Sequence, residues 1–377
     1  MRIAFLCKRQ YMRKDVIVDR YARLYEQPRQ LALLGHDVMG LCLSYRQTEA
    51  RDEYHEASPG KLHWIGLVPE GLGIAAYPRR AESALRSFAP DLLVGASDSP
   101  HIVLGDWLAR RLKIPYAVDL YDDFESFGLT RIPGMRTLYQ RAIRRAAVVS
   151  CVSDVLAKHI RDDYQAKGRV ISLPSTIDRA IFRRLDRDQC RLSLGLPADA
   201  QLVGTAGALQ REKGISPLYQ AFERLSPNHP QLHLVLAGRV EPSCPPPAGT
   251  KVHCLGELPH AQTAVLFNAL NVGVVYLRDT PYGRASFPQK AYEMLACGLP
   301  VVAAKVGAME DLFGNTPNSL YQADNVDSLA YCIQAQLGKP TIAELDIRDW
   351  ADLALEMDLT YLNVLQLEEH DGISTTR

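Results

Sequence analysis

A lysine and a glutamate lie three residues apart in the segment SFPQKAYEMLACGLPVVA, residues 286–303. Ser286 is followed three residues later by a glutamine, which matches a capping box, and Pro288 suits a first turn, so the segment predicts a helix that begins near Ser286. Unpaired N–H groups and a partial positive charge at such a helix end favour an anion. Lys290 and Glu293 would share a face, where a carboxylate can accept hydrogen bonds from both hydroxyls of a ribose. An ordinary surface ion pair explains the two charges equally well.

A second pair of charges lies in GALQREKG, residues 207–214, between an apolar run and a helical pattern. This glycine-bounded loop carries Arg211 and Lys213, which suit a diphosphate because arginine donates as a fork and lysine acts as a point charge. A solvated charged turn is the alternative. The diphosphate interpretation is strengthened by the first segment, because both segments would lie in the same half of the chain.

These charges must be positioned by a fold in which short apolar strands alternate with helices. In the first half, RIAFLC, DVMGLCL, PDLLVGAS, IPYAVDLYD and AAVVSCVS predict strands, and RYARLYEQPRQLALLGH predicts a helix interrupted by Pro28. A further helix, SDVLAKHIRDDY, has a start signal at Ser153 or Asp154. Near-continuous apolar strands that alternate with helices are typical of a parallel, doubly wound sheet.

The same pattern restarts after a polar connector, DRAIFRRLDRDQCRLSLGLPADA. We therefore predict an α/β chain of two Rossmann-like doubly wound domains that face a central cleft, with ligands at the carboxyl ends of the strands. The expected domains are residues 1–182 and 198–346, with a helix at about 347–369 that completes the first domain and a disordered polar tail at 370–377.

Composition narrows the function classes. The 377 residues include 43 basic and 43 acidic side chains, and the net charge of +0 argues against a whole-protein electrostatic grip on nucleic acid. The eight cysteines are scattered, without a C-x-x-C motif, and predict buried free thiols in a reducing cytosol. The N-terminal apolar run is too short for a signal peptide. The sequence contains no run of ~18 apolar residues, so we expect no membrane span. We expect a cytoplasmic protein.

The order of several segments resembles the family 4 glycosyltransferases, which are retaining enzymes with the GT-B fold. These segments are GALQREKGI, LHLVLAGRVEP, VHCLGELP, NVGVVYL and SFPQKAYEMLACGLPVVAAKVGAMEDLF in the second half, and PDLLVGASDSP, IPYAVDLYDDF, SCVSDVLAKHI and ISLPSTIDRAIF in the first. The resemblance covers most of the chain. It implies transfer of a sugar from a nucleoside-diphosphate sugar, of UDP or GDP type, to a hydroxyl of a glycan, lipid-linked or small-molecule acceptor. No cofactor is implied beyond this co-substrate.

Carried onto this sequence, the resemblance implies that Arg211 and Lys213 contact the donor diphosphate and stabilise the departing nucleotide. Lys290 would add positive charge at the phosphates, and Glu293, the second glutamate of an E-x7-E motif, would hold the ribose. The donor-binding residues that the resemblance implies are Gly207, His253, Leu255, Arg284, Ser286, Phe287, Pro288, Lys290 and Glu293.

The sequence departs from the family pattern at two positions where the family has site residues. Ala285 stands where the first glutamate of the E-x7-E motif is expected, and Tyr121 stands where the family often has a histidine. Tyr121 could donate a hydrogen bond on the acceptor side instead. Asp98, Asp122 and Asp123 lie at predicted strand ends and suit acceptor hydroxyls or, for Asp122, a catalytic role as base. Helix capping explains these aspartates equally well.

The implied transfer requires no metal ion, because cations and N–H groups aimed at the leaving diphosphate can stabilise its charge. The D-x-D motif at residues 186–188 lies in the polar connector and is better explained as solvated linker. A basic run from Arg131 to Arg145, near Arg110, Arg111 and Lys113, suits either contact with an anionic membrane or a solvated helix face.

Two other functions stay open. One is a sugar-nucleotide epimerase of GT-B type, which would need acidic catalytic residues that the sequence does not identify. The other is a non-catalytic subunit that binds sugar nucleotides or assists assembly, and Ala285 and Tyr121 favour it.

Overall fold

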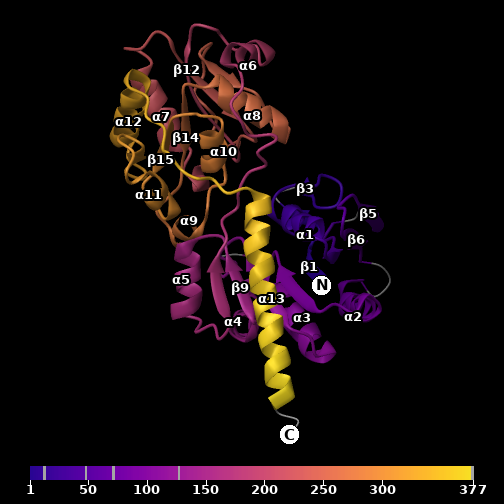
Figure 1. The fold of residues 1–377 in the computed structure, drawn as a ribbon. Helices are drawn as coiled ribbons and strands as arrows, with labels where there is room; N and C mark the ends of the chain where they lie inside the picture. The colour runs from indigo at the N-terminus through magenta and orange to yellow at the C-terminus, as the bar shows by residue number, and fades with distance from the viewer. Residues whose placement is uncertain (12–13, 47–48, 70–72, 126–127, 375–377) are drawn as a thin grey trace. The chain divides into compact units, whose positions relative to one another are not determined.

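The computed structural model describes residues 1–11, 14–46, 49–69, 73–125 and 128–374 (Figure 1). The chain forms two compact units: the first joins Met1–Ser175 to Trp350–Arg377, and the second is Thr176–Asp349. The expected boundary at residue 182 therefore lies inside the second unit. The polar connector belongs to the second unit as well, because it contains α6 (Arg187–Ser193), which packs on α8 (His260–Ala269).

An eight-stranded sheet forms the centre of the first unit, in the order β10-β9-β8-β7-β1-β4-β6-β5. All neighbouring strands are parallel except the edge pair β5 and β6. The strands are β1 (Arg2–Lys8), β4 (Asp37–Leu43), β5 (Arg51–His55), β6 (Lys61–Leu67), β7 (Leu92–Ala96), β8 (Tyr116–Leu120), β9 (Val148–Cys151) and β10 (Arg169–Ser172), and a separate ribbon pairs β2 (Gln10–Tyr11) with β3 (Lys14–Asp15). The chain winds outward from β1 in both directions, so β1 and β7 flank the point where the winding reverses.

The helical elements of the first unit are α1 (Arg23–Leu33), η1 (Gly73–Ala76), α2 (Tyr77–Phe88), α3 (Ser99–Leu112), η2 (Gly128–Arg131), α4 (Met135–Arg145), α5 (Asp154–Asp162) and α13 (Trp350–Ser374). The start of α5 is as predicted, because Ser153 Oγ accepts a hydrogen bond from the N–H of Leu156 at 3.2 Å. The predicted interruption at Pro28 is wrong, because α1 continues through it to Leu33. Leu24 and Leu31 bury one face of α1, and this packing offsets the backbone hydrogen bond that proline cannot make.

The helix α13 follows the second unit in sequence and packs in the core of the first. Trp350, Leu353, Met357 and Tyr361 are all buried there beside α1. The helix continues to Ser374, so the first part of the expected tail is helical, and residues 375–377 lie outside the described residues.

The second unit is built on a six-stranded parallel sheet, in the order β13-β12-β11-β14-β15-β16. Its strands are β11 (Gln201–Ala206), β12 (Leu232–Ala237), β13 (Val252–Cys254), β14 (Val272–Val275), β15 (Val301–Ala304) and β16 (Leu320–Tyr321). Besides α6 and α8, its helical elements are η3 (Arg211–Lys213), α7 (Ser216–Leu225), α9 (Pro281–Ala285), α10 (Lys290–Ala296), α11 (Ala308–Phe313) and α12 (Val326–Gly338). The winding reverses between β11 and β14.

Both faces of this second sheet are buried. Leu202 and Val235 point into one core cluster, whereas their neighbours Val203 and Leu234 point into another on the opposite face. Successive side chains of a strand alternate between the two faces, so strands covered on both sides must be apolar at nearly every position. This is why the strands could be predicted as continuous apolar runs.

All eight cysteines are free thiols, and all are buried except Cys254. Among the described residues, no helix combines the length and the apolar character needed to cross a membrane.

Candidate functional site

Two of the predicted donor residues, Gly207 and Lys290, lie close together where the winding of the second sheet reverses. Gly207 directly follows β11 in a left-handed conformation with φ 126°. A Cβ atom at this position would lie 3.1 Å from Lys290 Nζ. The glycine therefore lets the ammonium group of a later helix approach the end of β11.

The segment around Lys290 differs from the prediction in its helix boundaries. Ser286 ends the short helix α9, and its hydroxyl donates to the carbonyl of Gly283 at 3.0 Å, so the predicted capping box is wrong. The next helix, α10, begins at Lys290, and the Gln289 side chain donates to Glu293 Oε1 at 3.0 Å. Because α10 spans only residues 290–296, its helix end is a weaker basis for an anion site than the side-chain cations.

Two lysines face two tyrosines at this sheet edge. Lys290 Nζ lies 4.6 Å from the ring centroid of Tyr276, and Lys213 Nζ lies 4.1 Å from that of Tyr282. Lys213 Nζ also donates to the hydroxyl of Tyr282 at 2.8 Å. Aromatic faces attract cations but supply no full negative charge. The two tyrosines thus hold both ammonium groups in place at this end of the sheet.

The pKa of Lys290 lies below its ordinary value. Burial lowers the pKa of Lys290, the carboxylate of Glu293 opposes this effect, and the nearby charge of Lys213 adds to it, so that the pKa is about 8. The negative charge of a diphosphate would favour the protonated amine.

We expect the affinity for a nucleoside diphosphate to fall as the pH rises above about 8. The folded chain without ligand loses the Lys290 proton near that pH, so tight binding above it must take up a proton, which weakens affinity by up to about tenfold per pH unit. Calorimetric titration with UDP and GDP between about pH 7 and 9.5 measures this dependence. The matched control is Lys290→Arg, whose guanidinium stays charged throughout and should remove most of the slope. An equal slope in both proteins would contradict the assignment.

Glu293 is buried, with 7% of its surface exposed. Its Oε1 accepts the hydrogen bond from Gln289 and lies 3.4 Å from His260 Nε2, and the His260 ring packs edge-on against Phe182 at 4.8 Å. These contacts fix the orientation of the carboxylate. Glu293 is therefore a positioned group rather than a mobile surface charge, as holding a ribose would require.

Other predicted donor residues contact different partners. Arg211 is exposed, and its guanidinium donates to the carbonyl of Ser243 at 3.2 Å. Arg284 is exposed and pairs with Asp279. The structure therefore does not bring these two arginines into contact with the lysine pair.

The remaining predicted donor residues lie either at edge strand β13 or directly before α10. His253 lies within edge strand β13 and stacks on His233, with their ring nitrogens 2.9 Å apart. Leu255 follows that strand, and its N–H donates to the carbonyl of Leu236 at 2.9 Å. Phe287 packs edge-on against Tyr292 at 4.9 Å, and the carbonyl of Pro288 accepts from the N–H of Ala291 in the turn that opens α10.

On the first unit, the predicted acceptor residues lie at carboxyl ends of parallel strands, after β7 and β8. Asp98 caps α3: its Oδ1 accepts from the N–H of His101 at 3.0 Å and lies 2.6 Å from His101 Nδ1. Its Oδ2 accepts from the Tyr45 hydroxyl at 3.1 Å. Burial acts to raise the pKa of Asp98, but the charge and hydrogen bonds of His101 outweigh it, so this pKa lies below its ordinary value. The capping role of Asp98 is thus present in the structure.

The neighbouring strand end holds the other acceptor candidates. The Tyr121 hydroxyl donates to the carbonyl of Ser97 at 2.8 Å, and Lys8 Nζ lies 5.8 Å from its ring centroid. Asp122 Oδ1 accepts from the N–H of Asp123 at 3.0 Å, and Asp123 Oδ1 accepts from that of Glu125 at 3.1 Å. These aspartates thus shape the loop after β8.

The D-x-D motif has a structural role, because Asp186 Oδ1 accepts from the N–H of Gln189 at 2.9 Å and caps α6. Among the described residues, no group of three or more histidine, cysteine, aspartate or glutamate side chains is arranged to hold a metal ion.

Three site residues were missed in the sequence: Tyr276, Tyr282 and His260. Tyr276 lies in the run VVYL directly after β14, at the strand end where a ligand-facing side chain is expected. Tyr282 and His260 had no comparable signal, because each lies in the first turn of a helix, α9 or α8, and contacts a partner that is remote in sequence.

Comparison with known proteins gives matches for both halves of the chain. Residues 22–175 match the "glycosyl transferase 4-like domain" and residues 200–338 match the "glycosyl transferases group 1" domain. TuaC of Bacillus subtilis, assigned as a teichuronic acid biosynthesis glycosyltransferase, is 26% identical over 344 residues, which cover 84% of this chain and 86% of TuaC. D-inositol 3-phosphate glycosyltransferase 1 of Catenulispora acidiphila is 30% identical over 276 residues, or 64% of this chain and 63% of that protein.

Two solved structures extend the comparison to the fold. Sucrose-phosphate synthase from Thermosynechococcus elongatus superposes with a TM-score of 0.75 at 20% identity, covering 97% of this chain and 100% of that one. The Anabaena protein HepE, in complex with UDP-glucose, superposes with a TM-score of 0.66 at 17% identity, covering 99% and 100%. Such coverage shows that the fold is shared over nearly the whole chain.

Proposed function

Because this chain belongs to the family 4-like glycosyltransferases of GT-B fold, we propose that it transfers a sugar from a nucleoside-diphosphate sugar to a hydroxyl group of a carbohydrate or lipid-linked acceptor. The observation that carries the proposal is the pair Lys213 and Lys290, which two tyrosines hold at the reversal point of the second sheet. The oxygens of a donor diphosphate can accept charge-assisted hydrogen bonds from both ammonium groups.

The proposed donor is of UDP or GDP type. HepE was solved with UDP and with UDP-glucose, which favours uridine among the two. Glu293, held by Gln289 and placed beside His260, accepts hydrogen bonds from the ribose hydroxyls. Gly207 lets the backbone approach the diphosphate closely beside Lys290.

In the proposed reaction, the bond from the anomeric carbon to the diphosphate oxygen breaks as the acceptor hydroxyl bonds to the same carbon. Negative charge develops on the leaving diphosphate, where Lys213 and Lys290 stabilise it in place of a metal ion. The hydroxyl proton passes to the departing phosphate oxygen or to solvent. We propose retention of the anomeric configuration, which the family resemblance supports.

The proposed acceptor is a glycan or lipid-linked glycan. TuaC takes its name from the biosynthesis of a polysaccharide, teichuronic acid, which supports this class of acceptor.

Contact with an anionic membrane is a related proposal. The helix α4 exposes Arg141 together with Leu138, which is 46% exposed, so one helix presents both a positive charge and an apolar side chain.

A second candidate function is a sugar-nucleotide-binding subunit without transferase activity. It is favoured by Ala285, which stands in place of an acidic residue, and by Tyr121, whose hydroxyl is committed to the carbonyl of Ser97. This candidate predicts tight nucleotide binding without turnover.

The test is a panel of UDP- and GDP-sugars, with release of the nucleoside diphosphate measured in the presence and absence of simple glycoside acceptors. We expect one donor to raise the melting temperature and to be turned over slowly. Glu293→Gln should raise KM for this donor by about tenfold, because a neutral amide accepts weaker hydrogen bonds from the ribose. The matched control is Lys251→Ala. Lys251 directly precedes the amino end of β13, whereas the proposed donor site lies at carboxyl ends of strands. Binding without turnover of any donor would establish the second candidate instead.

A further inference from the structure

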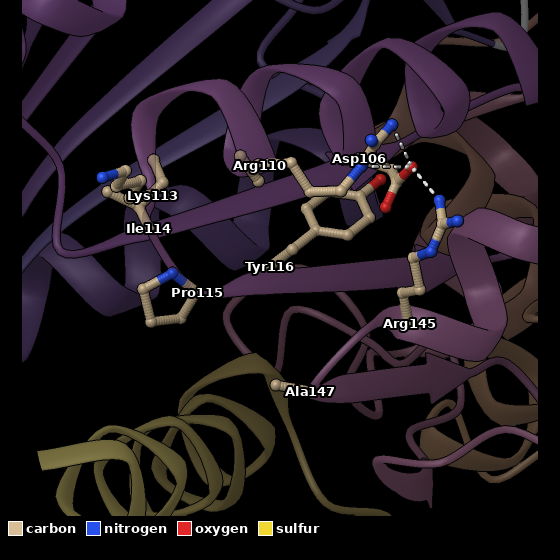
Figure 2. Close-up of a pocket in the computed structure, with 9 residues that line it drawn as sticks. Asp106, Arg110, Lys113, Ile114, Pro115, Tyr116, Arg145 and Ala147 are labelled. Carbon is tan, nitrogen blue, oxygen red and sulfur yellow. Dashed lines mark hydrogen bonds and ion pairs between the residues drawn. The ribbon is translucent and has the colours of Figure 1, made fainter. Parts of the chain in front are cut away.

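The first unit contains a cavity of about 260 Å³ at the sheet edge opposite to the predicted acceptor residues (Figure 2). Its floor is formed by Pro115 and Tyr116 where β8 begins and by Ala147 just before β9. These are the amino ends of parallel strands, whereas Asp98 and Tyr121 follow carboxyl ends. The cavity is thus a separate feature of the unit.

Three cations line this cavity against one carboxylate. Arg110 belongs to α3, Lys113 caps the end of the same helix, and Arg145 is the last residue of α4. Asp106 Oδ2 lies 3.1 Å from both Arg110 Nη2 and Arg145 Nη1, as the dashed lines in Figure 2 show. One buried oxygen therefore holds two guanidinium groups at the rim.

Most of the donor groups around the cavity stay available. Arg110 and Arg145 are 55% and 50% exposed, and Asp106 is the acceptor that each contacts among the described residues. The Lys113 ammonium has no hydrogen-bond or ion-pair partner within the described part of the chain. The Tyr116 hydroxyl, by contrast, is used internally, because it donates to the carbonyl of Ile102 at 2.7 Å.

Helix polarity explains part of this charge, since cations near the ends of α3 and α4 complement the helix dipoles. It does not explain why three cations converge on a concave surface with a single anion. Two guanidinium forks and an ammonium match the oxygens of a phosphate dianion better than a single carboxylate does. A water molecule occupies about 30 Å³ of liquid, so the cavity has room for a phosphate and part of the group esterified to it.

We propose that the cavity formed by Arg110, Lys113 and Arg145 binds a phosphate monoester, either a free small molecule or the headgroup of a membrane lipid. This site is independent of the proposed donor site, which lies in the other unit. The assignment therefore does not rest on the proposed transferase activity, and each can fail without the other.

The test measures binding of two probes to the full chain. Glycerol 3-phosphate is titrated by calorimetry as the free monoester. Sedimentation compares vesicles of phosphatidylcholine that contain phosphatidic acid, a monoester, with vesicles that contain phosphatidylglycerol, a diester, at equal surface charge. Binding of glycerol 3-phosphate identifies a soluble ligand, and preference for phosphatidic acid over phosphatidylglycerol identifies a lipid headgroup.

Lys113→Asn and Arg145→Gln are the variants, and Arg111→Gln is the matched control. Asparagine tolerates the left-handed conformation of residue 113, and Arg145→Gln leaves Arg110 on Asp106, so both variants should fold. Arg111 lies on the same helix but pairs with Glu82 outside the cavity. We expect at least about tenfold weaker binding in each variant and no change in the control. Nucleotide binding by the second unit should stay constant in all three.

Three results would overturn the proposal: neither probe binds, binding survives both variants, or Arg111→Gln weakens it equally. The last result would show that the surface acts only through its general charge. If Arg145→Gln fails to fold, Lys113→Asn still decides the question, because Lys113 does not contact Asp106.

Discussion

Replacing Lys213 with alanine is expected to lower kcat for nucleotide-sugar turnover by about 10²–10³-fold. The Lys213 ammonium is fixed by a 2.8 Å hydrogen bond to the Tyr282 hydroxyl and lies over the ring of the same tyrosine. It is therefore positioned before the donor arrives. A charge that is already in place stabilises the leaving diphosphate more as negative charge develops than it does in the bound donor.

The division between kcat and KM tests this role. A lysine that only attracted the donor would raise KM and leave kcat unchanged, whereas a group that stabilises the leaving diphosphate lowers kcat. Tyr282→Phe is the matched control, because it keeps the aromatic face and removes only the hydrogen bond, so a loss of about tenfold or less is expected. Steady-state kinetics on the preferred donor measures both. A Lys213→Ala enzyme with wild-type kcat would contradict the assignment.

Arg211 provides a comparison within the same loop. Its guanidinium contacts the carbonyl of Ser243 and is exposed, so the structure gives no reason to expect an effect as large as that of Lys213 unless the side chain turns toward the donor. The family resemblance treats the two cations alike, whereas their surroundings in this chain differ. Substituting Arg211 and Lys213 separately would therefore show which of the two contributes more to kcat.

Much of the fold could be predicted because the sheets are covered on both faces. Leu202 and Val203 are adjacent and face opposite cores, so the strand appears in the sequence as an uninterrupted apolar run. The edge strand β5 carries the sequence RDEYH and has no such run, and it forms because β6 offers it a hydrogen-bonding edge. Edge pairing of this kind depends on tertiary structure and leaves little trace in local sequence.

The site could be predicted only in part, for a related reason. Lys290 and Glu293 were identified from their spacing, but the approach of Lys290 to Gly207 depends on the winding that brings the ends of β11 and β14 together. The helix start was misplaced because the Ser286 hydroxyl has a nearer acceptor, the carbonyl of Gly283. A local capping pattern cannot reveal such competition, which appears only once α9 has formed.

Removing the carboxylate of Asp119 is expected to destabilise the first unit by about 3–5 kcal/mol. Asp119 lies on β8 and is 1% exposed, and the Arg23 guanidinium of α1 donates to it at 2.7 Å and 3.0 Å. Ser150 Oγ on β9 donates to Oδ1 at 2.6 Å, so one carboxylate joins three elements. Burial alone would lower the pKa of Arg23, but Asp119 outweighs it and raises that pKa above its ordinary value.

The cost arises because Asp119→Ala leaves the Arg23 charge buried without its partner, and not because the ion pair itself is strongly stabilising. The double variant Arg23→Met, Asp119→Leu should therefore be more stable than Asp119→Ala alone, since it removes both charges.

The chain has three tryptophans, Trp64, Trp107 and Trp350, and all lie in the first unit. Their fluorescence during urea denaturation reports on this unit even if the two units unfold separately. Asp162→Ala, which removes an exposed carboxylate on α5, is the control and should shift the midpoint little. If Asp119→Ala matched this control, or if the double variant were less stable than Asp119→Ala, the uncompensated charge could not be the source of the destabilisation.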